Sequence, residues 1–240
     1  MQRVTGSGHH YRYDYKSKRN VMKKYVLLFG LLIQAVSVLA QEASVGKSIF
    51  SVHAGASWYL GKMIGITNNS DAYRNDLRNG IAWDANYYFL GDKYIFGSFK
   101  LAPGLIYQGG RYKNAHDESS DKILMHYIAP QLALFMVKQK YNLSLSTGVG
   151  YQHYKDKSFV YGKPRDVSMN KLAYNLSMGG EYLLSPLVGI SAKLNWIVTS
   201  SESYSVRYHV QKWQVESPEL SGGGGCFSQL SLLFGMNLHF

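Results

Sequence analysis

The sequence has a single cysteine, Cys226, in 240 residues, so it can form neither an internal disulfide nor a Cys-x-x-Cys metal site. Charged residues are scarce at 17%. Of the 26 Lys and Arg, seven lie in residues 1–40, together with one of the 15 acids, which leaves 19 bases and 14 acids, a net charge of +5, in the remainder. This mild excess is typical of a solvated surface and argues against a nucleic-acid partner.

Residues 41–240 also lack any apolar run that approaches the ~20 residues of a membrane-spanning helix. One apolar run precedes them, residues 26–40 (VLLFGLLIQAVSVLA), with Lys23 and Lys24 just before it and small residues at its end. A positive start, a short apolar stretch and a small-x-small ending predict a secretory signal peptide, which we assign to residues 22–40.

The signal peptide divides the chain. Residues 1–21 have no apolar periodicity, and we expect them to be a disordered upstream extension. Residues 41–240 form the expected mature domain. The 20 tyrosines and 24 glycines of the whole sequence, together with few charges, are typical of a strand-rich protein.

Strict alternation of apolar residues is the main signal in this domain. Counted back from Phe240, every second residue is apolar as far as Leu230, the pattern of a strand with one apolar face. Similar alternation predicts seven more strands, at residues 49–60, 81–90, 95–107, 123–136, 141–151, 172–184 and 188–198. The sequence therefore predicts an all-β protein of eight antiparallel strands.

The connections between these strands alternate in length. Short turns follow the second, fourth and sixth strands, at residues 91–93, 137–140 and 185–186. Long polar segments follow the other strands, at residues 61–80, 108–122, 152–171 and 199–225. Short turns at one rim and long loops at the other are typical of an up-and-down barrel in an outer membrane.

The polar face of the strands is dominated by Gly, Ser and Asn, which suits the interior of a narrow barrel. A soluble, lipocalin-like barrel with its apolar residues inside is the alternative, but its outer face would carry more Lys, Glu and Thr. Rare ionisable residues on the polar face should pair with one another, because an isolated buried ion is costly. The ionisable residues on the polar face therefore predict a polar cluster in the lumen, made by His53, Asp84, Lys100, Glu181 and Lys193.

Residues 41–240 resemble the small eight-stranded outer-membrane barrels of Gram-negative bacteria, in the OmpA/OmpX style, and also the porin-family or PorT-like barrels. The resemblance is one of pattern, and its most specific part is the end of the chain. Gly235, Leu238 and Phe240 match the family's assembly signal, whereas Leu233 departs from it because a polar residue is usual there.

The resemblance implies an eight-stranded antiparallel up-and-down transmembrane β-barrel in the cell outer membrane, with short periplasmic turns and long extracellular loops. It implies outer-membrane lipid and lipopolysaccharide as surroundings, and the barrel assembly machinery as the partner that recognises Gly235, Leu238 and Phe240. No peptidoglycan-binding domain is expected.

Catalytic and metal-binding patterns are not evident. Some relatives modify the acyl chains of lipid A with a His-x-Ser pair, but no histidine after residue 40 has Ser two positions later. No two histidines share a predicted strand at i, i+2, so we expect neither a metal nor another cofactor. His126 falls on the apolar face, and we interpret it as an interfacial rather than a catalytic residue. The sequence thus predicts a protein that is not an enzyme.

Eight strands leave an interior that side chains fill, which disfavours an open pore. The favoured function is therefore a structural or surface-interaction role through the extracellular loops, since loops on a rigid scaffold usually carry binding. In the fourth loop, Tyr204, Tyr208 and Trp213 are interpreted as extending the strands above the membrane. One alternative is a subunit of a secretion or transport assembly with an envelope protein partner. A lipid A acyl-modifying enzyme is the less favoured alternative.

Overall fold

The computed structural model describes residues 47–61, 63, 65–91, 94–95, 98–116, 119–201, 203–216 and 225–240. These residues belong to one compact unit, Ser44–Phe240. The expected extension at residues 1–21 and the signal peptide at residues 22–40 lie outside the described residues.

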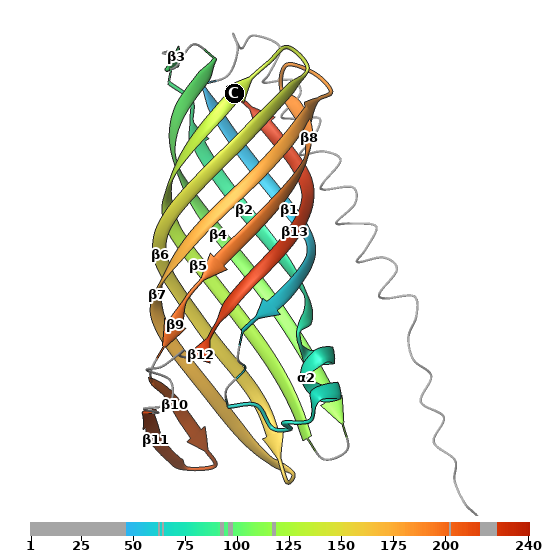
Figure 1. Ribbon diagram of the computed structural model, residues 1–240, viewed down its shortest axis with the longest axis vertical. Coiled ribbons are helices and arrows are strands. Elements are labelled where there is room, and N and C mark those ends of the chain that lie inside the picture. Colours follow the sequence, from blue (N-terminus) through green and yellow to red (C-terminus); the bar gives the residue numbers. More distant parts are fainter. Residues whose placement is uncertain are drawn as a thin grey trace, which may run out of the picture. The chain divides into compact units, whose positions relative to one another are not determined.

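Eight long strands close into an antiparallel barrel (Figure 1). They are β1 (Ser48–Leu60), β2 (Asn79–Phe89), β4 (Phe99–His116), β5 (Ser119–Val137), β6 (Tyr141–Val160), β7 (Lys163–Leu183), β8 (Val188–Val198) and β13 (Ser228–His239). Neighbours in the chain pair with each other, β8 pairs with β13, and β13 pairs with β1. The prediction of an eight-stranded up-and-down barrel is confirmed, because β13 pairs with both β1 and β8 and so closes the sheet in the membrane-spanning part.

Shorter elements lie between the barrel strands. At the short-turn end, β3 (Tyr94–Ile95) pairs with β4. The long-loop end carries α2 (Asp71–Leu77), the pair β9 (Ser200–Ser201) and β12 (Gly225–Cys226), and the hairpin of β10 (Ser203–Tyr208) and β11 (Gln211–Glu216). Ser70 caps α2 by accepting a hydrogen bond from the Tyr73 amide at 3.3 Å. No helix within the described ranges is long and apolar enough to cross a membrane.

The barrel is apolar outside and polar inside. On β6, the outward side chains of Leu143, Leu145 and Val149 are about half exposed, whereas the inward Asn142 and Ser146 are buried. A soluble barrel would have the opposite arrangement, so the lipocalin-like alternative is wrong. A contiguous exposed apolar surface of this extent needs hydrocarbon around it.

Aromatic side chains border this apolar band at both of its ends. At the short-turn end, exposed rings come from Tyr87, Phe89, Tyr141, Tyr182 and Phe240. Toward the long-loop end they come from Trp58, Tyr107, Tyr151, Tyr174 and Trp196. Beyond Tyr151, the next three outward residues of β6 are polar, namely His153, Lys155 and Lys157. These two aromatic girdles are the expected boundaries of a membrane-spanning barrel.

Two of the four expected long loops are continuations of the barrel strands. The segment 108–122 continues the β4–β5 hairpin as far as the pair His116 and Ser119, and the segment 152–171 continues β6–β7 as far as Val160 and Lys163. The prediction of loops there was wrong.

The physical reason is a reversal in the alternation of the strand. Within the band, outward Ile128 and Leu132 are apolar, but farther along β5 the outward Lys122 is exposed and the inward Ile123 and Met125 are buried. Above the band the outside is water, so the apolar residues change faces. A prediction that follows one continuous apolar face therefore ends the strand where the reversal begins.

The inward apolar residues build a core at the long-loop end, which we call the head core. Its members come from the segment before β2, which includes α2, from the upper parts of five barrel strands, from β10 and from the residue just before β13. They are Tyr59, Met63, Ile66, Tyr73, Leu77, Tyr112, Ile123, Met125, Tyr154, Val167, Met169, Val206 and Phe227. This end of the barrel is therefore a packed head rather than a set of free loops.

Candidate functional site

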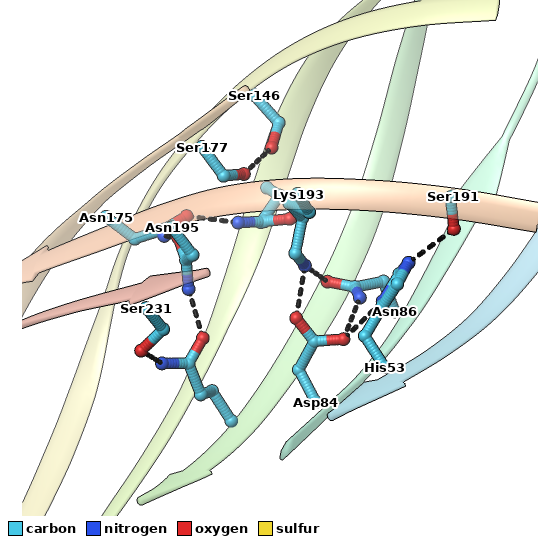
Figure 2. A network of polar contacts seen from close by, with 12 residues as sticks. His53, Asp84, Asn86, Ser146, Asn175, Ser177, Ser191, Lys193, Asn195 and Ser231 are labelled. Carbon is cyan, nitrogen blue, oxygen red and sulfur yellow. Dashed lines mark hydrogen bonds and ion pairs between the residues drawn. The ribbon is translucent and has the colours of Figure 1, made fainter. Parts of the chain in front are cut away.

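Three of the five residues predicted for the lumen meet in one cluster (Figure 2). His53 on β1 lies opposite Asp84 on β2, with Nδ1 2.7 Å from Oδ1 of Asp84. From β8, the Lys193 ammonium pairs with the Asp84 carboxylate and donates to Oδ1 of Asn86 at 3.1 Å. The side chain of Asp84 is fully buried, so its charge needs this pairing.

The other two predicted residues do not join that cluster. Glu181 on β7 accepts a hydrogen bond from Asn142, at 2.8 Å, and lies 2.6 Å from Nε2 of His239. Lys100 is half-buried, with its ammonium 4.9 Å from the centre of the Tyr94 ring. Because β4 begins at Phe99, Lys100 lies at the mouth of the barrel and not in its middle.

A chain of amide side chains crosses the lumen beside the ion cluster. Gln131 donates to Asn175, Asn175 to Asn195, and Asn195 to Gln108, whose Nε2 donates to Oγ of Ser231 at 3.2 Å. These side chains come from five strands and are buried. A cavity of about 40 Å³ remains on the short-turn side, which is room for ordered water. The amide chain therefore closes the middle of the lumen as a hydrogen-bonded plug, while a wider space of about 640 Å³ lies at the short-turn mouth.

On the outer face, His126 of β5 and His153 of β6 lie opposite each other at the upper boundary of the apolar band. Their rings stack with centroids 6.4 Å apart. Nδ1 of His126 is 2.8 Å from the Tyr107 hydroxyl, and Nδ1 of His153 is 2.6 Å from Oδ1 of Asn170. His126 thus takes the interfacial position expected for it, and its hydrogen bond goes to a tyrosine rather than to a serine nucleophile.

A buried acidic pair lies inside the head. Nη2 of Arg165 is 3.6 Å from Oδ1 of Asp121 and 3.8 Å from Oδ2 of Asp156. The other oxygen of Asp121 accepts hydrogen bonds from the Thr67 amide and the Tyr73 hydroxyl, both at 2.9 Å. One guanidinium therefore serves two carboxylates whose side chains are fully buried.

This pair lies above the apolar band, which ends on β6 at Tyr151. Burial, together with repulsion from Asp121, raises the pKa of Asp156 to about 8. Burial also raises the pKa of the Tyr73 phenol to about 12. A proton on Asp156 leaves Asp121 to pair with Arg165, and the group is then electrically neutral.

The acids and histidines of the described residues do not gather into a metal site. No group of three or more His, Cys, Asp and Glu side chains in that part of the chain could hold a metal ion. The two acidic residues of the head were missed in the sequence, because segments 108–122 and 152–171 were interpreted as loops. The sequence signal for them was an acidic residue at a position that faces inward if the alternation of the strand is continued.

Comparison with known proteins gives the fold. No protein-family model matches the chain, and no curated protein matches it. A solved structure of a major outer membrane protein from Thermus thermophilus is similar at 14% identity and a TM-score of 0.51, covering 80% of this chain and 99% of that chain. The outward apolar band shows in addition that the barrel spans a membrane, which a shared fold alone does not show. The chain is an eight-stranded outer-membrane β-barrel.

Two other solved structures are similar to this outer-membrane barrel. One is Ail, the attachment invasion locus protein of Yersinia pestis, solved with the heparin analogue sucrose octasulfate, at 14% identity. That match covers 81% of this chain and 99% of Ail, with a TM-score of 0.47. The other is the outer membrane protease OmpT of Escherichia coli, at 10% identity, covering 80% of this chain and 95% of OmpT, with a TM-score of 0.43.

The residues predicted as the assembly signal lie on or beside β13 of this barrel. Gly235 is opposite His53, Leu238 is opposite Phe50, and Phe240 exchanges two backbone hydrogen bonds with Ser48, at 2.8 and 3.0 Å. Gly235 has a direct structural role, because a Cβ there would lie 1.9 Å from the Val52 carbonyl oxygen. Recognition of these residues by the assembly machinery stays a prediction.

Proposed function

We propose that this outer-membrane barrel has a surface-interaction role and that its extracellular head binds a protein partner. The observation that carries this proposal is the exposure of apolar residues at the tips of two hairpins. Tyr161, between β6 and β7, is 83% exposed, and Val210, between β10 and β11, is 86% exposed. Tyr161 and His209 adopt positive φ angles of 50° and 55°, so both tips are tight turns.

The two tips belong to one connected sheet. The β6–β7 hairpin is paired up to its tip, and β10 pairs with β7 from Ser205 opposite Ser168 to Tyr208 opposite Arg165. The head core packs beneath both hairpins through Val167 and Val206. A partner would therefore meet a preformed surface, and binding would lose little conformational entropy.

Other functions have less support. The amide chain across the lumen favours a closed barrel over a pore. The hydrogen bonds of His126 and His153 go to Tyr107 and Asn170, which favours a protein that is not an enzyme. A subunit of a secretion or transport assembly remains compatible with an extracellular or envelope protein partner.

The experiment is capture of cross-linked partners on the folded barrel, with a double variant of the tips, Tyr161→Ser with Val210→Ser. The matched control is Gln211→Ser, an exposed polar position beside one tip. We expect one protein to be captured by the wild type and the control but lost from the double variant. Capture that is equal in all three would contradict a role for the tips.

The same experiment separates the alternatives. A stable complex that co-purifies in stoichiometric amount would identify an assembly subunit. Mass spectrometry of lipid A from cells with and without the gene tests the enzymatic alternative, and we expect the same acyl pattern from both.

A further inference from the structure

Five basic side chains face outward just above the membrane band, on three consecutive strands. They are Arg111 and Lys113 of β4, Lys122 of β5, and Lys155 and Lys157 of β6. Their direction follows from their neighbours, because the intervening Tyr112, Ile123 and Asp156 are buried inside the barrel. We call these five residues the basic grid.

The strand register arranges the grid in two rows. In the row nearer the membrane, Arg111 is opposite Leu124, which is opposite Lys155. In the row above, Lys113 is opposite Lys122, which is opposite Lys157. Opposed residues on neighbouring strands are about 5 Å apart, and like charges at that distance repel. An anion over the grid would relieve this repulsion.

No counter-ion for the grid comes from the described residues, since none of the five forms an ion pair with them. Asp121 and Asp156 face inward, and the nearest acid that faces outward, Asp166, is opposite Lys157 but pairs with the Arg207 guanidinium. The buried Nε of Arg111 has no hydrogen-bond partner. The grid therefore has unused donors and an uncompensated positive charge.

The height of the grid indicates which anion would meet it. Arg111 lies four residues beyond Tyr107 on β4, and Lys155 lies four residues beyond Tyr151 on β6. Four residues span about 13 Å along a strand, and about 10 Å along the barrel axis at the usual tilt. The headgroup layer is about 5 to 8 Å thick, so long side chains at this height reach its phosphates.

We propose that the basic grid binds the phosphate groups of an anionic glycolipid in the outer leaflet, the diphosphorylated lipid A part of lipopolysaccharide. Leu124, between Arg111 and Lys155, gives the site an apolar centre that suits a lipid better than a soluble anion. The acyl chains would continue down the apolar band below. This site is independent of the partner proposed for the hairpin tips.

The test uses the full barrel in phosphatidylcholine nanodiscs that contain diphosphorylated lipid A, or lipid A from which both phosphates have been removed. The triple variant carries Lys113→Gln, Lys122→Gln and Lys155→Gln. The control carries Lys138→Gln, Lys140→Gln and Lys163→Gln, three exposed lysines outside the grid, so the net charge changes equally. Native mass spectrometry counts the lipid A molecules that each barrel retains.

We expect the wild type and the control to retain diphosphorylated lipid A preferentially, and the triple variant to bind it about tenfold more weakly or worse. Equal retention by the triple variant and the wild type would overturn the proposal. So would equal retention of the phosphate-free lipid, or displacement of lipid A by millimolar inorganic phosphate. Heat-modifiable gel migration checks folding, and the single variant Lys122→Gln should show an intermediate loss if the triple variant folds poorly.

Discussion

Asp121 of β5 and Asp156 of β6 are buried in the extracellular head with a single guanidinium between them. Arg165 can neutralise one of the two carboxylates, and burial leaves the other to bind a proton. The segment between β1 and β2 depends on this arrangement, because Thr67 in its loop and Tyr73 in α2 both hydrogen-bond to Asp121. The packing of the head is therefore linked to pH.

We predict that the head loosens as pH rises toward and through about 8. The folded pKa of Asp156 is raised above that of the unfolded chain, so its stabilisation is complete below about pH 4 and declines up to about pH 8. The measurement is the hydrogen-exchange protection of the Thr67 amide between pH 5 and 9, corrected for the intrinsic exchange rate. In Asp156→Asn, which stays neutral, the protection should not vary with pH. The same slope in both proteins would show that another group is responsible.

The lumen gives a second prediction. Replacing Lys193 with Met leaves the buried Asp84 with His53 and Asn86 but without its ammonium partner, which should cost about 3–5 kcal/mol of the free energy of unfolding. Adding Asp84→Asn should recover part of this loss, since no unpaired ion then remains. Urea unfolding of the barrel in lipid vesicles measures both values.

The control for this prediction is Lys140→Met, a change of the same size at an exposed position in the β5–β6 turn. A cost for Lys193→Met no greater than that for the control would mean that water or neighbouring amides can replace the ammonium group. A double variant less stable than Lys193→Met would contradict the role of the unpaired charge.

The spanning parts of the strands could be predicted from the sequence because one physical rule governs them, apolar outward and small or polar inward. On β6, the predicted end at residue 151 is where the lipid ends and the rule reverses. The extent of the head could not be predicted in this way, because Tyr154 and Met169 are apolar residues that face inward.

The candidate sites were harder to predict for a different reason. The contact of His53 with Asp84 follows from the pairing of neighbouring strands. The contact of Lys193 with Asp84 crosses the lumen, so it depends on the closure and stagger of the whole barrel. The same holds for Arg165, which reaches Asp121 from a strand that is not adjacent to β5.

Gly235 gives a third prediction, which concerns folding without any assembly machinery. In Gly235→Ala the new Cβ would lie 1.9 Å from the Val52 carbonyl oxygen, so β1 and β13 would have to separate at the closure of the barrel. We expect a loss of about 1–3 kcal/mol or more on refolding from urea into detergent. Gly91→Ala is the matched control, because nothing lies within 4 Å of its added Cβ. If Gly235→Ala refolds as well as Gly91→Ala, close packing does not explain why glycine occupies position 235, and the assembly signal would be the main explanation.

Phe240 should behave in the opposite way. Its backbone hydrogen bonds with Ser48 survive in Phe240→Ala, and its ring is 56% exposed, with one tilted contact to Tyr87 at 6.4 Å. Refolding in detergent should therefore change little. Phe234→Ala is a close control, because Phe234 lies on the same face of β13 and is 59% exposed.

If Phe240 is recognised by the barrel assembly machinery, the two variants will differ only in cells. We expect Phe240→Ala to lower the amount of barrel in the outer membrane strongly while Phe234→Ala lowers it slightly, measured as the heat-modifiable fraction. Equal insertion of the two variants would show that Phe240 acts only as one more lipid-facing aromatic. A refolding defect specific to Phe240→Ala would instead assign its effect to closure of β13 on β1.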